Sequence, residues 1–114
     1  MAAPSLPAAE PLVLDSLIAQ TPSGIASRVI ARSAGGNVTL FAFDAGQELS
    51  EHTAPFDALV IVLRGAFDLT IGGQPVRATE GMVVRLPAHV PHAVAAAAEA
   101  RMILIMLRSD ASAG

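Results

Sequence analysis

Short runs of alternating apolar and polar residues follow one another along most of the chain, and glycine or proline separates them. Alternation with a period of two predicts β-strands, because successive side chains of a strand point to opposite faces of a sheet. The predicted strands are 25–31, 38–43, 58–63, 66–71, 74–78, 82–86, 92–97 and 101–107. Short strands at this regular spacing, without a long helix between them, predict an all-β domain, either a sandwich or a barrel.

Turn residues and the N-terminal segment complete this outline. The pair Gly72-Gly73 between two strand patterns predicts a two-residue hairpin. Residues 11–19 precede the first strand and predict a short helical or irregular segment. Residues 1–10 contain prolines and alanines without periodicity, so we expect a disordered or extended lead-in. The single domain is therefore expected to span residues 11–114.

Two predicted segments, 58–63 and 102–107, are apolar at every position. A strand of a small antiparallel domain usually faces water on one side, so something must cover the second face of these strands. The candidates are the N-terminal segment, a second sheet or another copy of the chain. Burial of one large aliphatic side chain is worth about 1.5–3 kcal/mol, and several exposed ones would promote aggregation. We therefore expect a homodimer that forms through a strand-bearing face.

The composition excludes several classes of function. Of the 114 residues, 53% are hydrophobic and 15% are charged, which excludes a disordered polypeptide. A net charge of −3 and seven scattered arginines exclude a basic surface for nucleic acid. The absence of cysteine excludes disulfides, a thiolate nucleophile and a cysteine-based zinc site. No apolar run approaches the roughly 20 residues of a membrane span, and no signal peptide is recognisable, so we expect a cytoplasmic protein without a membrane partner.

The histidines stand in two blocks with distinctive spacing. The first block reads Gly46, five residues, His52-Thr53-Ala54, three residues, Ala58, six residues, Gly65. The second block reads Gly81, five residues, Pro87-Ala88-His89, two residues, His92, three residues, Ala96. These spacings resemble the two motifs of the cupin family, in particular the small single-domain, RmlC-like cupins of bacteria. The abundance of alanine and the use of arginine alone as the basic residue are typical of a GC-rich bacterial genome.

The resemblance implies a double-stranded β-helix, the jelly-roll barrel of cupins. It also implies metal ligands, which in metal-binding cupins are two histidines and a glutamate of the first motif and the histidine of the second. Only His52 and His92 remain at those positions here, and Ala54 and Ala58 replace the other two ligands. His89 is a candidate third ligand, although a solvent-exposed loop residue is the simpler interpretation. Imidazole ligands suit Zn, Ni, Fe or Cu, and a site with so few donors would bind weakly.

Strand parity also predicts the lining of the barrel. Positions that share a face with the two histidines are small and apolar, which indicates a pocket for a small, largely apolar molecule. The predicted lining residues are Ala54, Ala58, Val60, Val62, Val84, Val94 and Ala96, with Phe56 at the mouth. Arg85 has the opposite parity, so we expect it to face outward and pair with an acidic neighbour; an anion-binding group inside the pocket is the alternative.

Three hypotheses on function follow. The first is a cupin that binds a small molecule in its barrel, with a weakly held divalent metal on His52 and His92 as a candidate cofactor. The second is a metal-dependent enzyme of the dioxygenase or isomerase type. The third is a non-catalytic sensor or structural dimer with a degenerate site. The sequence leaves open whether the protein is an enzyme, although the absence of tyrosine closes the epimerase route that pairs a histidine base with a tyrosine acid.

Overall fold

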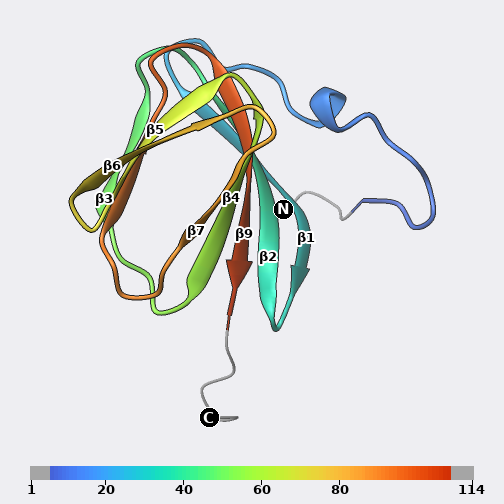
Figure 1. Cartoon of the computed structure of the whole chain (residues 1–114). Helices are drawn as coiled ribbons and strands as arrows, with labels where there is room; N and C mark the ends of the chain where they lie inside the picture. The colour runs from blue at the N-terminus through green and yellow to red at the C-terminus, as the bar shows by residue number, and fades with distance from the viewer. Residues whose placement is uncertain (1–5, 109–114) are drawn as a thin grey trace.

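Two antiparallel β-sheets face each other across one hydrophobic core (Figure 1). The structure is a computed structural model that describes residues 6–108. Sheet A has five strands in the order β1-β2-β9-β4-β7, and sheet B has four in the order β3-β8-β5-β6. The strands are β1 Ile25–Ser33, β2 Gly36–Phe43, β3 Glu48–His52, β4 Asp57–Arg64, β5 Ala66–Ile71, β6 Gln74–Thr79, β7 Val83–Leu86, β8 His92–Ala95 and β9 Ala100–Leu107. This architecture confirms the predicted all-β jelly-roll barrel.

Eight of the nine strands coincide with predicted ones to within a few residues. The hairpin between β5 and β6 also forms as predicted, because Gly72 and Gly73 both adopt the positive φ of a tight primed turn. The strand β3, Glu48–His52, was not predicted. Only Leu49 within it is half-buried and the other four residues are exposed, so this strand carries no hydrophobic alternation.

The core fills the space between the inner faces of the two sheets. Phe43 of β2 and Phe67 of β5 meet there edge to face, with ring centroids 5.0 Å apart and an interplanar angle of 81°. Edge-to-face packing of this kind adds to the stabilisation that the buried apolar area provides. The other buried members of the core are Ala58, Val60, Val62, Leu69, Ala78, Leu86, Val94, Ala96, Ala100 and Met102.

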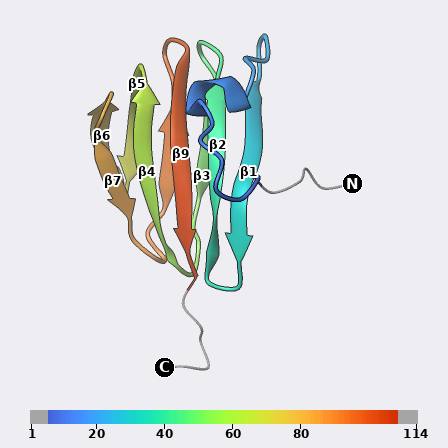
Figure 2. The ribbon, with the colours of Figure 1, turned by 90° about the vertical axis from the view of Figure 1, so that its right-hand side faces the viewer.

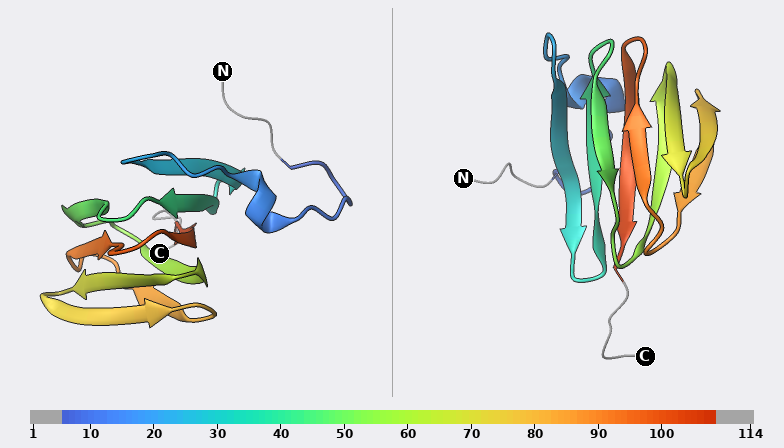
Figure 3. Two further views of the ribbon diagram at one scale, coloured as in Figure 1. Left: turned by 90° about the horizontal axis from the view of Figure 1, so that it is seen from above. Right: turned by 90° about the vertical axis from the view of Figure 1, so that its left-hand side faces the viewer.

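Residues 12–20, which we call the N-terminal strap, lie across the outer face of sheet A (Figure 2, Figure 3). The strap contains one turn of 3₁₀ helix, Leu14–Leu17, which confirms the predicted short helical segment. Side-chain hydrogen bonds attach it to the sheet: Arg101 to Asp15, Arg28 to the carbonyl of Leu17, and Gln20 to the carbonyl of Phe43. Residues 1–5 of the predicted lead-in lie outside the described residues.

The strap covers one end of the outer face of sheet A. Leu40 and Ala42 are completely buried, although neither belongs to the core between the sheets. The inner faces of the two sheets cover each other, and the strap covers part of the outer face of sheet A. Of the three candidates for covering the strands that are apolar on both faces, the second sheet and the N-terminal segment therefore both contribute. Within residues 6–108, no helix is long and apolar enough to cross a membrane.

Candidate functional site

Two histidine side chains meet in sheet B. His52 ends β3 and His92 begins β8, and the pairing of these antiparallel strands places the two residues directly opposite each other. The register of the pair shifts between Leu49 and His52, which marks a β-bulge. The two Nε2 atoms lie 3.2 Å apart, and the ring centroids lie 4.4 Å apart. His92 is only 6% exposed whereas His52 is exposed, so one face of the pair is accessible to solvent.

Backbone carbonyl groups fix the tautomer of both rings. Nδ1 of His52 lies 3.0 Å from the carbonyl oxygen of Ser50, and Nδ1 of His92 lies 3.2 Å from that of Val90. A carbonyl oxygen only accepts hydrogen bonds, so each Nδ1 donates its hydrogen. In the neutral rings both Nε2 atoms therefore carry a lone pair, and the two lone pairs face each other. The two lone pairs repel each other unless a shared proton or a cation lies between the two nitrogens.

The environment of His92 favours its neutral form. Burial lowers the pKa of His92 below its usual value, the hydrogen bond to the Val90 carbonyl partly opposes this shift, and the neighbouring His52 lowers the pKa further. His92 is therefore mostly unprotonated at neutral pH, which leaves its Nε2 lone pair free to bind.

Strand parity predicted the orientation of the lining residues, but most of them pack tightly. Ala58, Val60, Val62, Val94 and Ala96 are all buried members of the core. Val84 packs against that core, and Ala54 is half-buried. Phe56 lines a separate hollow of about 320 Å³ together with Pro55, Asp57, Ala88 and Leu107. Neither His52 nor His92 lines this hollow. An open pocket at the pair, lined by the predicted residues, stays a prediction.

The acidic residues near the first motif are not directed at the histidine pair. Asp57 accepts hydrogen bonds from the Ala88 backbone at 2.8 Å and from Arg85 at 3.0 Å. The Ala88 bond, followed by Arg85, holds the pKa of Asp57 below its usual value. The outward orientation of Arg85 and its pairing with an acidic neighbour are thereby confirmed. Glu51 is exposed, and within residues 6–108 no three metal-ligating side chains come together.

His89 lies in the turn before β8. Its side chain is exposed, and its backbone nitrogen donates to the Ala54 carbonyl oxygen at 2.7 Å. Its φ of 63° is in the left-handed region, which favours glycine. A role of His89 as third metal ligand stays a prediction. Sequence reasoning missed the carbonyls of Ser50 and Val90, which each lie two residues before a site histidine.

These features define a class of protein: a small β-barrel of two sheets, with a pair of histidine side chains where two strands meet. The sequence profile of the cupin domain matches residues 39–108, and the chain belongs to this family. The predicted resemblance is therefore confirmed.

Solved structures of bacterial proteins show the same fold. A conserved Streptococcus pyogenes protein of unknown function is 29% identical, with a TM-score of 0.87 and 97% of each chain covered. A cupin superfamily protein from Desulfitobacterium hafniense is 31% identical, with a TM-score of 0.85, covering 93% of this chain and 97% of that one. A cupin 2 conserved barrel domain protein from Leptotrichia buccalis is 31% identical over 83% of this chain and 46% of its own, with a TM-score of 0.79. No curated protein matches the chain.

Proposed function

We propose that this cupin binds a small, largely apolar molecule at the His52–His92 pair, through a divalent cation held between the two Nε2 atoms. The observation that supports the proposal is the convergence of two Nε2 lone pairs at 3.2 Å. Two neutral acceptors at this distance repel each other unless a proton or a cation lies between them.

The distance suits a shared metal ion. Imidazole nitrogens bind first-row metals at about 2.0–2.1 Å, so two nitrogens 3.2 Å apart subtend an angle of about 100° at one ion. That angle lies between the octahedral and tetrahedral values. Metal-bound histidines also typically donate their second N–H to a backbone carbonyl, as both rings do here.

Two donors make a weak site. Protein metal sites usually supply three or more ligands, so water or a donor atom of the bound molecule would complete the coordination. Neutral imidazole favours Zn, Ni, Fe or Cu, and a bound cation would act as a Lewis acid toward an oxygen or nitrogen of the ligand. Protonation below about pH 6 would weaken binding.

The surroundings indicate the kind of ligand. By register, Ile71 pairs with His92, and Leu49 and Val94 pair with each other one step further along sheet B. These side chains are apolar and buried or half-buried, and they would exclude water from one side of a bound molecule. Exposed His52 leaves the other side open for entry. A small molecule with one metal-binding atom and an apolar body fits this arrangement.

Metal titration tests the proposal. Untagged protein is titrated with Ni²⁺ or Zn²⁺ in a calorimeter at about pH 7.5, where imidazole is neutral. We expect one site per chain, and a loss of affinity of about tenfold or more in His52→Gln. His89→Gln is the matched control. If this variant binds the metal with unchanged affinity, the site contains only two histidines. If it loses as much affinity as His52→Gln does, His89 is the third ligand. The proposal fails if the wild type binds no metal, or if His52→Gln binds as the wild type does.

The enzyme hypotheses need a separate test. A dioxygenase or isomerase would turn over substrate only in the metal-loaded form, whereas a binding protein would only retain its ligand. The finding that would favour a degenerate sensor or structural protein is a wild type that binds neither metal nor ligand. Cytoplasmic location and self-association stay predictions.

A further inference from the structure

One row of side chains crosses all four strands of sheet B at the end of the barrel where the histidine pair lies. His52 of β3 lies opposite His92 of β8. His92 lies opposite Ile71 of β5, and Ile71 lies opposite Gln74 of β6. Cross-strand partners share one face of a sheet. This row, which we call the mouth row, therefore leads from two imidazoles across one aliphatic side chain to a carboxamide.

The mouth row lies on the inner face of sheet B. Ile71 follows Leu69 by two positions on β5, and Gln74 precedes Val76 by two positions on β6. Leu69 belongs to the core and Val76 packs against it. Side chains two positions apart on a strand point to the same face, so Ile71 and Gln74 also point inward. Ile71 is half-buried and Gln74 is exposed, which places this row where the interior of the barrel opens to solvent.

The hairpin that carries Gln74 is attached to the segment that precedes His92. The backbone nitrogen of Gly72 donates to the Pro91 carbonyl oxygen at 2.8 Å. A Cβ at residue 72 would lie 3.2 Å from Cγ1 of Val90, so the hairpin packs closely against this segment. The Val90 carbonyl oxygen also accepts the Nδ1 hydrogen bond of His92. The same two residues therefore hold both His92 and the hairpin, which fixes the distance between the backbones at the two polar ends of the mouth row.

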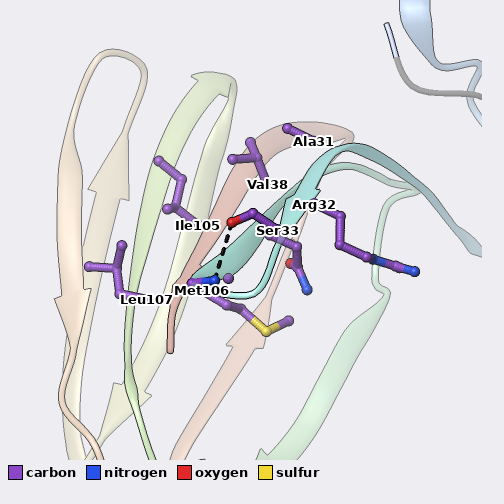
Figure 4. Close-up of a pocket in the computed structure, with 10 residues that line it drawn as sticks. Ala31, Arg32, Ser33, Val38, Ile105, Met106 and Leu107 are labelled. Carbon is purple, nitrogen blue, oxygen red and sulfur yellow. Dashed lines mark hydrogen bonds between the residues drawn. The ribbon is translucent and has the colours of Figure 1, made fainter. Parts of the chain in front are cut away.

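Sheet A provides the opposite wall at this end of the barrel. Residues 53–56 connect the end of β3 to the start of β4, so both sheets end here (Figure 1). Ala58 of β4 belongs to the core, and Met106 of β9 is its cross-strand partner on the same face. Figure 4 shows Met106 extending away from Ile105, in agreement with this inward orientation. The space above Ile71 is thus bordered by one small and one flexible apolar side chain, which adapt to an apolar chain.

The β6 end of the mouth row is polar but uncharged. The carboxamide of Gln74 both donates and accepts hydrogen bonds. Arg77, the arginine of β6, has the opposite parity and pairs with Asp68 at 3.0 Å on the outer face. A carboxylate next to Gln74 would therefore meet no cationic group of the mouth row. A hydroxyl or amide group of a ligand matches the carboxamide better.

We propose that the molecule bound at the histidine pair has two polar ends, a carboxylate on the cation and a neutral hydroxyl or amide group against Gln74, joined by an unbranched apolar chain over Ile71. This inference rests on the proposed function. Carboxylate oxygens bind zinc at about 2.0–2.2 Å, so the carboxylate supplies a missing ligand. Two strand spacings, about 10 Å, separate the backbones of His92 and Gln74, and the side chains shorten this span to that of a chain of about six carbons.

Calorimetric titration of the zinc-loaded full chain tests the proposal. The probes are 6-hydroxyhexanoate and hexanoate, which differ only in the terminal hydroxyl. We expect 6-hydroxyhexanoate to bind about threefold to tenfold more tightly, because one hydrogen bond to Gln74 is gained. The analogues 4-hydroxybutanoate and 8-hydroxyoctanoate test the length, and neither should gain as much over its own unsubstituted acid.

A variant of Gln74 separates this inference from the metal site. Gln74 is exposed, so Gln74→Leu should fold, which circular dichroism checks. We expect it to bind zinc with unchanged affinity and to lose the preference for 6-hydroxyhexanoate. Thr70→Val is the matched control, because Thr70 lies next to Ile71 on the opposite face and its change should leave the preference intact. His52→Gln should lose affinity for zinc and for both probes.

The outcomes distinguish the two proposals. Equal affinity of the wild type for the two six-carbon probes, or a preference that persists in Gln74→Leu, would overturn the role of Gln74 while zinc binding still supports the histidine pair. A gain that is equal at all three chain lengths would overturn the two-ended geometry. A loss of zinc affinity in Gln74→Leu as large as that in His52→Gln would make Gln74 a metal ligand instead. A wild type that binds no zinc would overturn the proposed function and this inference with it.

Discussion

Substitution of Asp15 tests whether the N-terminal strap is an integral part of the fold. The Asp15 carboxylate lies between two arginines of sheet A, Arg64 and Arg101. Asp15→Ala removes the carboxylate from both. Most of the resulting loss of stability should come from the contact with Arg101, because the Arg101 side chain is only 12% exposed whereas that of Arg64 is 58% exposed.

The magnitude follows from the two environments. Arg101 donates to the Asp15 carboxylate at 2.8 Å and to the Asp15 carbonyl oxygen at 2.7 Å. A hydrogen bond to a charged group contributes about 1.5–3 kcal/mol to stability, and loss of the carboxylate leaves a nearly buried guanidinium with one of its two acceptors. The exposed pair with Arg64 contributes about 0–1 kcal/mol because water screens it. We therefore expect Asp15→Ala to reduce the free energy of unfolding by about 2–3 kcal/mol.

Urea denaturation, followed by far-ultraviolet circular dichroism, measures this change. Arg64→Ala is the matched control, since it removes only the exposed partner and should cost about 1 kcal/mol or less. The midpoint for Asp15→Ala should fall well below that of Arg64→Ala. A loss below about 0.5 kcal/mol, or two variants of equal stability, would refute the argument that the strap is held through Arg101.

Further predictions concern two glycines and two histidines. In urea denaturation, Gly65→Ala should destabilise the fold by more than Gly46→Ala. Both glycines have positive φ. A Cβ at residue 65 would lie 2.8 Å from the carbonyl oxygen of Glu99, whereas a Cβ at residue 46 would meet nothing within 4 Å. Equal losses would contradict the steric argument. His89→Gly should raise the free energy of unfolding by about 0.5–1 kcal/mol, because it relieves a positive φ of 63°, and an unchanged midpoint would count against this. The lowered pKa of His92 means that the unfolded chain binds the proton more readily. This contribution to stability is complete above about pH 6.5 and is lost as the pH falls through the lower pKa of the folded state. Unfolding measured against pH should show this loss in the wild type and not in His92→Gln, and parallel curves would show that another group is responsible.

Much of the fold was predictable because it depends on local patterns. Alternation and turn residues located eight strands, and parity placed Arg85 on the outer face. The strand β3 was not predicted because Leu49 is its only half-buried residue, so it has no hydrophobic alternation. This strand forms through its pairing with β8. Motif spacing identified His52 and His92, but their contact depends on a β-bulge that shifts the register before His52.

The interior of the barrel shows a second limit of sequence reasoning. Parity establishes which face a side chain occupies, and it placed Val60, Val62 and Val94 correctly on the inner face. It does not establish how closely the two sheets approach each other. Their separation depends on all facing side chains together, and large ones such as Phe43 and Phe67 fill the space that small residues leave.

The proposed function requires that His52 and His92 hold one cation between them. Anomalous X-ray diffraction from crystals grown with Ni²⁺ or Zn²⁺, measured above and below the metal absorption edge, tests it most directly. We expect one anomalous peak per chain, at about 2.0–2.1 Å from the Nε2 atoms of both histidines. A peak at another residue, or no peak between the two rings at a metal concentration that saturates the protein in solution, would contradict it.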